Sequence, residues 1–297
     1  MKQMGVFWSG MVGVDEVLRV EDTQLGMYRV GNKRPEWTRA LRRSVQAACF
    51  TTARVFALTE GGQLASLPRR PFENAYTLAL PQRPYRALLL VQENPPRIAA
   101  LPHSGELLLL APPEERPTRV PVSQHPLWSG CVAPNQTVLV SDEAGQVWGI
   151  QKSQVAFRWE GALGGILAWA LHPTQPIVAG AGVDGIIRVW SFPSGKLQVA
   201  LAGHRFEVLQ VLFDKQGDLL LTFGSDAQLL VWRWRESQLP RHYLRLPAPP
   251  QNALLHRDAK GELWLLTSAE MHRLDLNKLE WRSIAIQTLT KKEAQQR

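Results

Sequence analysis

Short apolar segments of two kinds recur along the chain. In the first kind nearly all residues are apolar, as in residues 85–91 and 165–171, and such a run predicts a strand buried on both faces. In the second kind apolar and polar residues alternate, as in residues 75–80, 154–159 and 196–201, which is typical of a strand with one face in water. Proline and glycine crowd the connections. The pattern therefore predicts an all-β chain.

One stretch of this pattern occurs twice without a gap, at a spacing of 42 residues. Residues 161–190 align with residues 203–232, and both copies begin with glycine and end with Val-Trp. A fixed spacing between 20 and 50 residues indicates a repeat architecture, in which each unit packs on its neighbours.

Weaker copies of the unit cover the rest of the chain. The residues expected at the position of the final tryptophan are spaced by 37 to 43 residues: Tyr28, Ala65, Leu108, Trp148, Trp190, Trp232 and Leu274. Each unit contains an apolar first strand, a hairpin and an alternating outer strand. The sequence thus predicts seven units of four strands.

The copy at residues 203–232 resembles the WD repeat of β-propeller proteins. It contains Gly203-His204, two strands, Asp226 and Trp232, where the family has a Gly-His pair and later a Trp-Asp pair. Arg233 stands in place of the final Asp. The resemblance is specific over about residues 126–235 and weaker elsewhere. It implies a seven-bladed β-propeller with four antiparallel strands in each blade.

The resemblance also implies a role for four side chains of this copy. In the family, a His, a Ser or Thr, an Asp and the Trp of one repeat form a buried hydrogen-bonded network. The matching residues are His204, Thr222, Asp226 and Trp232. Such a network rigidifies a blade when every member is paired, so we expect a structural role for His204 and Asp226.

The units define the expected domain boundaries. Residues 1–287 form one propeller domain, and residues 288–297 form a polar tail. The first unit begins with its innermost strand near Gly5, and the seventh ends with its outer strand near residues 278–286. Because no blade is shared between the two ends, we expect the ring to close by side-chain packing between the first and seventh blades.

The charge and the cysteine content predict a basic surface without a concentrated patch and cysteines without a disulfide or a metal. The net charge is +8, and the pI is about 9.8, but no run of five like charges occurs, so the basic residues are dispersed over the surface. Cys49 and Cys131 fall on predicted innermost strands, where a thiol acts as a small hydrophobe. Two cysteines in 297 residues fit a reducing compartment, and we expect a cytoplasmic protein.

Residues 161–183 contain no charged side chain, which raises the alternative of a membrane span. Pro173 and Pro176 interrupt the stretch, and the 42-residue repeat makes it two strands and a turn. The sequence therefore predicts no membrane insertion.

The chain contains no recognised catalytic or metal-binding motif. The seven histidines lack a metal-ligand spacing, and no phosphate-binding loop or nucleophile elbow occurs, so no cofactor is expected. Four aspartates would lie at one end of the central channel, but their register makes them turn residues first: Asp22, Asp142, Asp184 and Asp226.

Binding is the chemistry that the sequence supports. On the propeller face that carries the loops entering each innermost strand, arginines and aromatic residues occur together, as in many protein interfaces. The candidate partner-binding residues are Arg39, Arg42, Arg43, Arg83, Tyr85, Arg86, Trp128, Arg205 and Phe206. A second basic group is expected on the other face, where Trp234 between two arginines is a candidate contact.

The resemblance implies a non-catalytic scaffold that binds other proteins, as a monomeric propeller within a complex. This inference rests on the fold, since no site identifies the partner. Two alternatives are a nucleic-acid-binding propeller, suggested by the excess of 25 arginines over 9 lysines, and a propeller enzyme with a site at the channel mouth.

Overall fold

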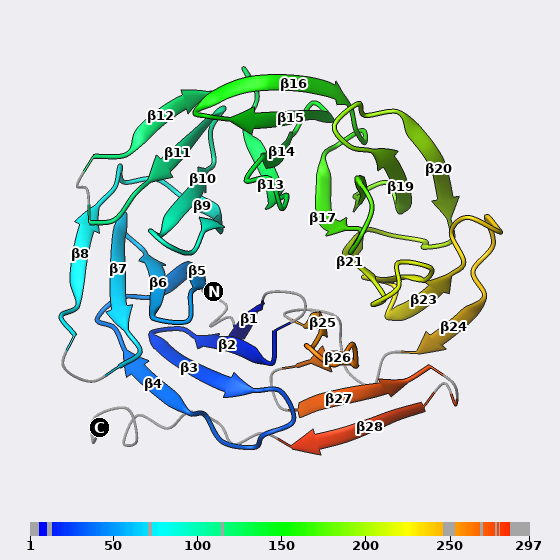
Figure 1. The fold of residues 1–297 in the computed structure, drawn as a ribbon, viewed down its shortest axis with the longest axis horizontal. Coiled ribbons are helices and arrows are strands. Elements are labelled where there is room, and N and C mark those ends of the chain that lie inside the picture. Colours follow the sequence, from blue (N-terminus) through cyan, green and yellow to red (C-terminus); the bar gives the residue numbers. More distant parts are fainter. Residues whose placement is uncertain are drawn as a thin grey trace.

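The structure is a computed structural model that describes residues 6–10, 14–70, 73–113, 116–245, 253–267, 270–276, 278 and 280–285. The described residues form 28 strands, arranged in seven sheets of four. The sheets stand around a central axis as seven blades (Figure 1). The prediction of an all-β, seven-bladed propeller is confirmed.

Each blade consists of four consecutive strands, numbered outward from the axis. Blade 1 contains β1 (Val6–Gly10), β2 (Glu16–Glu21), β3 (Gln24–Arg29) and β4 (Trp37–Ala40). Blade 2 contains β5 (Val45–Phe50), β6 (Arg54–Thr59), β7 (Gln63–Pro68) and β8 (Tyr76–Ala79). Blade 3 contains β9 (Tyr85–Gln92), β10 (Arg97–Pro102), β11 (Glu106–Leu110) and β12 (Thr118–Pro121).

The remaining four blades follow the same order. Blade 4 contains β13 (Leu127–Val132), β14 (Val138–Asp142), β15 (Gln146–Gln151) and β16 (Gln154–Glu160). Blade 5 contains β17 (Ile166–Leu171), β18 (Ile177–Gly182), β19 (Ile186–Ser191) and β20 (Leu197–Ala202). Blade 6 contains β21 (Val208–Phe213), β22 (Leu220–Gly224), β23 (Gln228–Trp232) and β24 (His242–Arg245). Blade 7 contains β25 (Leu254–Arg257), β26 (Leu263–Leu266), β27 (Glu270–Asp275) and β28 (Glu280–Ala285).

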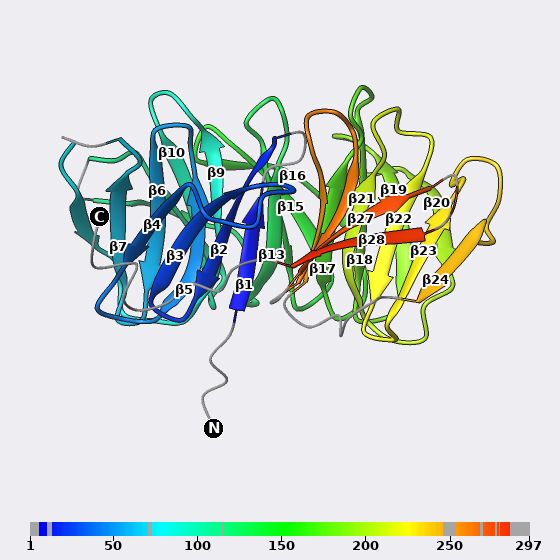
Figure 2. The same cartoon turned by 90° about the horizontal axis from the view of Figure 1, so that it is seen from below.

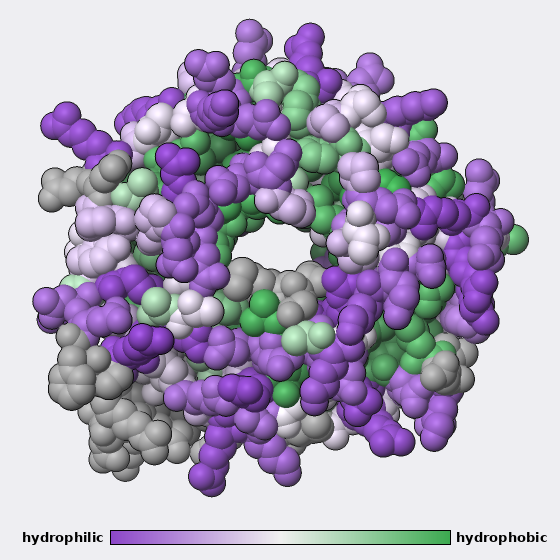
Figure 3. Space-filling view, in the orientation of Figure 1, coloured by the Kyte–Doolittle hydropathy of each residue, from purple (hydrophilic) through white to green (hydrophobic). Residues whose placement is uncertain are grey.

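Some innermost strands, β9 and β13 above all, are less buried than their sequence predicts. The second strands β14, β18 and β22 are buried throughout, whereas most residues of the first strands β9 and β13 are only half-buried. The expected full burial of residues 85–91 is therefore wrong. The physical reason is the central channel, which stays open in the space-filling view, so that one side of each first strand faces it (Figure 3).

The core is divided among the junctions between blades. Each of seven clusters of buried apolar side chains combines residues of two neighbouring blades. At the junction of blades 5 and 6, for example, Trp232 packs with Ala179 and Val189. Each blade therefore buries its apolar faces only against its neighbours, as expected for a repeat protein.

The ring closes by packing, as the sequence predicts. In the described residues β1 pairs only within blade 1 and β28 only within blade 7, so these strands are not exchanged between the sheets. Tyr28 of blade 1 lies in one apolar cluster with Trp264 and Met271 of blade 7. His256 Nε2 also lies 2.7 Å from the carbonyl oxygen of Val14 across the same junction.

The position of the repeated tryptophan differs from the sequence alignment in blade 4. Trp190 pairs across its hairpin with Val178, twelve positions earlier, and the pair with this spacing in blade 4 is Val138 with Ile150. Trp148 pairs instead with Val140. The alignment on tryptophan is wrong because the hairpin turn, not the identity of the ring, sets the register.

The same spacing corrects two further units. Leu67 and Leu110 take this position in blades 2 and 3, in place of Ala65 and Leu108. In blade 4, Asp142 then corresponds to Gly182 and not to Asp184. The polar tail at residues 288–297 lies outside the described residues, so its extent and the domain boundary at residue 287 stay predictions.

Candidate functional site

The connections between strands gather on two faces, because the strands of each blade are antiparallel (Figure 2). The first face carries the connections that enter each innermost strand and those between second and third strands. The second face carries the connections from first to second and from third to fourth strands. Five of the predicted partner-binding residues lie in connections of the first face: Arg42, Arg43, Arg83, Arg205 and Phe206.

Arg86 and Trp128 lie together although they come from different blades. Arg86 is the second residue of β9, and Trp128 is the second residue of β13. The guanidinium carbon of Arg86 lies 4.4 Å from the centre of the Trp128 ring, a cation–π contact. Arg86 is exposed and Trp128 half-buried, so the pair is presented on the innermost strands where they begin at the first face.

Tyr85 belongs to the core and not to the binding surface, which corrects the sequence expectation. Its side chain is 6% exposed, and its hydroxyl donates to the carbonyl oxygen of Pro81 over 3.0 Å. Burial raises the pKa of Tyr85 to about 12. Strand alternation explains the difference, since Tyr85 and Arg86 point to opposite sides of β9.

The remaining predicted arginines of blades 1 to 3 differ in their contacts with other residues of the protein. Arg83 forms an ion pair with Glu106 at 2.5 Å. Arg43 donates to the carbonyl oxygen of Glu60, while Arg42 is exposed. Arg39 lies on the outer strand β4, with its guanidinium carbon 5.5 Å from the ring centre of Trp37. Arg42, Arg43 and Arg86 are therefore the exposed cations of this group.

Three exposed apolar side chains lie on the first face of blades 4 to 6. Leu163 is 83% exposed, Phe206 is 60% exposed and Val183 is 39% exposed. The loops approach closely, because a Cβ on Gly164 would lie 2.5 Å from Cγ2 of Val183, and one on Gly185 would lie 2.9 Å from the carbonyl oxygen of Phe206. We name Leu163, Val183 and Phe206 the apolar group.

The apolar group adjoins the Arg86–Trp128 pair. A Cβ on Gly165, in the loop of Leu163, would lie 3.3 Å from Cγ of Trp128. The sequence pattern predicted Phe206 as a binding residue but not Leu163 or Val183. The sequence feature that could have identified them is the uncharged stretch of residues 161–183. Leu163 and Val183 lie in its connections between strands, where an apolar side chain is not needed for the core.

The four residues of the expected network lie in one hydrogen-bonded chain. His204 Nδ1 lies 3.1 Å from each carboxylate oxygen of Asp226, and His204 Nε2 lies 2.8 Å from the hydroxyl of Thr222. Trp232 donates its indole N–H to the same hydroxyl over 2.9 Å. Burial lowers the pKa of His204, and the carboxylate of Asp226 opposes this shift.

The network also fixes the loop that exposes Phe206. The backbone N–H of Arg205, the residue between His204 and Phe206, donates to Asp226 over 3.1 Å. Asp226 accepts a second backbone bond from Gln228 in the turn between β22 and β23. The Asp226 carboxylate therefore joins two connections of the first face. Its oxygens accept structural hydrogen bonds.

Blade 4 contains a different buried carboxylate. Asp142 is fully buried and accepts hydrogen bonds from the Ser123 hydroxyl over 2.6 Å and from the Trp148 indole N–H over 2.9 Å. It also accepts from the backbone N–H of Gln146. Trp148 thus bonds this carboxylate, and its half-buried ring packs against the apolar cluster at the junction of blades 3 and 4.

The second face holds the other basic group, and here one expectation is wrong. Trp234 is 2% exposed, packs beside Phe213 and donates its indole N–H to the carbonyl oxygen of Gly217 over 2.9 Å. It is a core residue because the junction of blades 5 and 6 takes a second aromatic ring after Trp232. Arg69 of this face is paired with Glu16.

Among the described residues, no group of three or more His, Cys, Asp or Glu side chains could hold a metal ion. A helix with the length and apolarity needed to cross a membrane is likewise absent from the described part. Cys49 and Cys131 lie on the innermost strands β5 and β13 as free thiols. Burial raises the pKa of both, that of Cys131 to about 12.

Comparison with known proteins agrees with this geometry. The family described as "WD domain, G-beta repeat" matches residues 153–191 and 195–233. The small ribosomal subunit protein RACK1 of Neurospora crassa is 29% identical over 108 residues, which cover 36% of this chain and 33% of that protein. The WD repeat-containing protein 37 of Mus musculus is 31% identical over 110 residues, which cover 37% and 21%.

A third relative is the transducin beta-like protein 3 of Rattus norvegicus, 29% identical over 102 residues, which cover 34% of this chain and 13% of that protein. The matches span a third or less of the length of these relatives. The two family matches lie in blades 4 to 6, where the apolar group also lies. The chain therefore contains two repeats that match the WD family, within a ring of seven four-stranded blades that has the architecture of a β-propeller.

Proposed function

We propose that the chain is a non-catalytic scaffold that binds partner proteins on its first face. The observation that carries the proposal is the apolar group, three exposed side chains from three neighbouring loops. Exposed apolar side chains that gather in one place mark interaction sites, whereas singly scattered ones do not. The group adjoins the Arg86–Trp128 pair, and Arg and Trp are residue types enriched in interface hot spots.

The charge around the apolar group indicates the kind of partner. Arg205 is exposed beside Phe206, where Glu207 is also exposed, and Arg86 is exposed in the adjoining pair with Trp128. Arg42 and Arg43 are exposed farther along the same face, between blades 1 and 2. The partner surface should therefore combine a large apolar side chain with carboxylates, which Arg binds in a bidentate manner. The name of one relative, a protein of the small ribosomal subunit, denotes a component of a larger assembly, which agrees with a role inside a complex.

The test is affinity purification of the tagged full chain from its native lysate after nuclease treatment. A double variant, Leu163→Glu with Phe206→Glu, should lose the co-purified protein, since a carboxylate cannot enter an apolar pocket without a partner. Both side chains are more than half exposed, so the fold should persist. The matched control is Leu239→Glu, because Leu239 is 72% exposed but lies on the second face.

Two outcomes would contradict the proposal. Equal recovery with the double variant and with the control would show that the apolar group is not the binding site. Loss of all co-purified protein on nuclease treatment would favour nucleic acid as the primary ligand, and binding of duplex or single strands should then fall steeply with salt.

A further inference from the structure

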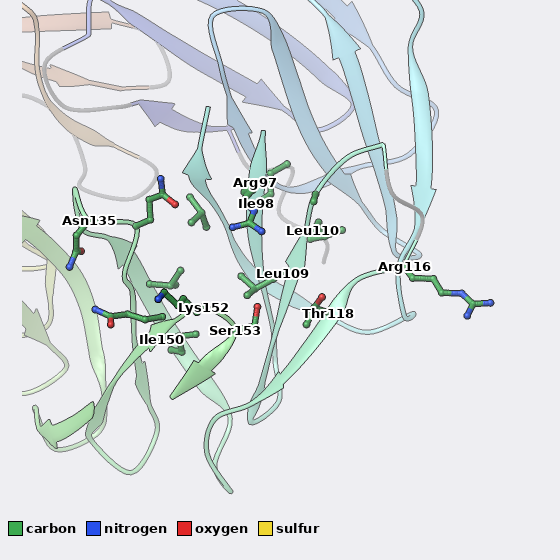
Figure 4. Close-up of a pocket in the computed structure, with 15 residues that line it drawn as sticks. Arg97, Ile98, Leu109, Leu110, Arg116, Thr118, Asn135, Ile150, Lys152 and Ser153 are labelled. Carbon is green, nitrogen blue, oxygen red and sulfur yellow. The ribbon is translucent and has the colours of Figure 1, made fainter. Parts of the chain in front are cut away.

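A cavity of about 600 Å³ opens on the second face between blades 3 and 4. Its floor is apolar and its rim is polar (Figure 4). The floor consists of Val91, Ile98, Leu109, Leu110, Val138 and Ile150. This volume lies within the range of ordinary ligand sites, which run from about 300 to 1,000 Å³.

The cavity exists because blade 4 has an aliphatic and a charged residue where blades 5 and 6 have aromatic rings. Ile150 stands at the position of Trp190 in blade 5, which packs against Trp159 of blade 4 with ring centres 6.4 Å apart. Two residues later, Lys152 stands at the position of Phe192, whose ring lies 5.9 Å from that of Phe157.

Blade 6 repeats the aromatic arrangement. Trp232 and Trp234 stand at these two positions, and both are buried at the junction with blade 5. The junctions of blade 4 with blade 5 and of blade 5 with blade 6 are thus closed by rings. The junction of blade 3 with blade 4 keeps an opening above Ile150, which is itself 2% exposed.

The described lining residues carry positive charge and no carboxylate. Arg97 enters from blade 3 and Lys152 from blade 4, and both are exposed. Figure 4 shows these two side chains near the apolar floor, whereas Arg116 extends away from it at the edge. Glu114 and Glu115 lie outside the described residues.

The backbone holds the rim of blade 4 in place. Lys152 and Ser153 form the two-residue turn between β15 and β16, with φ of 48° and 64°. Gln136, also at the rim, has φ of 63°. Positive φ at both central residues is the geometry of a two-residue hairpin turn whose twist matches its strands, so the hairpin fixes the direction of Lys152 and Ser153. The amide of Gln151 donates to the Thr137 hydroxyl over 2.8 Å, which joins the two rim segments.

We propose that this cavity is a second docking site, which binds an acidic peptide segment of a partner protein by one large apolar side chain. The apolar side chain enters the cavity above Ile150, and carboxylates on both sides of it pair with Arg97 and Lys152. The amides and hydroxyls of the rim can bond the peptide backbone. The inference rests on the proposed scaffold function, but it uses different residues on the opposite face.

The test is fluorescence anisotropy with the purified full chain and a labelled eight-residue peptide that has one phenylalanine between glutamates. Saturable binding is expected below about 1 mM, the weak end of specific recognition. Two control peptides replace the phenylalanine by alanine or the glutamates by lysines, and each should bind at least about tenfold more weakly, a difference of about 1.4 kcal/mol.

Ile150→Trp is the sharpest variant, because it installs the ring that blades 5 and 6 have at this position. It should weaken binding of the phenylalanine peptide by about tenfold or more while the thermal midpoint stays unchanged. Arg97→Glu with Lys152→Glu should weaken it similarly, and the weakening should diminish at high salt. The matched control is Lys196→Glu with Arg245→Glu, two exposed cations at the outer strands of blades 5 and 6.

Absence of binding to the unmodified chain, or equal binding by Ile150→Trp and the unmodified chain, would overturn the proposal. Equal binding of the alanine peptide would overturn it as well, since the apolar anchor would then be irrelevant. The variant Leu163→Glu with Phe206→Glu should still bind the peptide. That variant separates the two sites. Its failure to co-purify the partner tests the first face, and its retained binding of the peptide tests the cavity on the second face.

Discussion

At the scale of single residues, the buried polar groups of the blade 6 network are paired and therefore structural. His204, Thr222, Asp226 and Trp232 bond one another, and the same carboxylate orders the backbone next to Phe206. Leaving one such group without a partner costs more than a hydrogen bond gains, because the desolvation of that group is no longer offset.

We expect Thr222→Val to reduce the free energy of unfolding by roughly 2–3 kcal/mol, because the buried Trp232 N–H and His204 Nε2 both lose their partner. The measurement is urea denaturation followed by tryptophan fluorescence. Thr118→Val on the exposed outer strand β12 is the matched control and should change little. A loss below about 0.5 kcal/mol for Thr222→Val would show that the network contributes nothing beyond a surface substitution.

The sequence predicted the members of this network but not the burial of several aromatic side chains. The four residues follow a spacing pattern within one repeat, so the sequence of that repeat alone is enough to predict that they meet. Tyr85 and Trp234 are buried by strands of the adjacent blade, and Trp128 meets Arg86 across a blade junction. Such contacts form between neighbouring blades, so the sequence pattern of a single repeat does not predict them.

At the scale of elements, the junctions between blades are the units of stability. The closing junction of blades 1 and 7 differs from the others, because its residues are about 240 positions apart, as Gly31 and Met271 illustrate. Met271 is fully buried there, and its sulfur accepts the backbone N–H of Gly31 at 3.3 Å.

Met271→Ala should therefore lower the free energy of unfolding by about 2–5 kcal/mol and open the ring at this junction first. Hydrogen exchange should accelerate in β1, β2, β27 and β28 before it accelerates elsewhere. Met27→Ala, at the junction of blades 1 and 2, is the comparison: a similar loss of stability is expected, without preferential exchange in β27 and β28. Uniform exchange in both variants would argue that the ring opens as a whole.

The strand pattern illustrates what an element's sequence can determine. Alternation correctly placed the outer strands β8, β16 and β20, because one face of each meets water whatever the neighbouring blade contains. Continuous apolarity did not distinguish the half-buried first strands from the fully buried second strands. The channel that exposes the first strands is a property of the closed ring and not of one blade.

At the scale of the whole molecule, seven repeats distribute charge and histidines over a ring. Four histidines of blades 5 to 7 are buried, and burial lowers the pKa of each: His172, His204, His256 and His272. The unfolded chain therefore binds more protons than the folded chain as the pH falls below the ordinary histidine pKa of about 6.5.

The free energy of unfolding should consequently fall as the pH drops through about 6.5, with each histidine contributing at most about 1.4 kcal/mol per pH unit. Above this pH the histidine contribution is fully present. Urea denaturation at several pH values checks the sign and the window. His256→Gln should make the slope shallower, and His125→Gln, at an exposed position, should not. Stability that rises on acidification would contradict the direction of these pKa shifts.

The whole fold was predictable because seven weak repeats support one another. Only two of them match the WD family description, yet the spacing of the others places 28 strands in seven blades. The binding surface was less predictable. Leu163 and Val183 become neighbours of Phe206 only when three blades are side by side, and the cavity above Ile150 reflects rings that blade 4 lacks.

Hydrogen–deuterium exchange with and without the co-purified partner tests the central claim most directly, that this propeller binds a protein on its first face. Protection is predicted in the loops that hold the apolar group, residues 161–165, 183–185 and 204–206, and at Arg86 and Trp128. Protection confined to the outer strands, or to the second face without any at these loops, would contradict the claim.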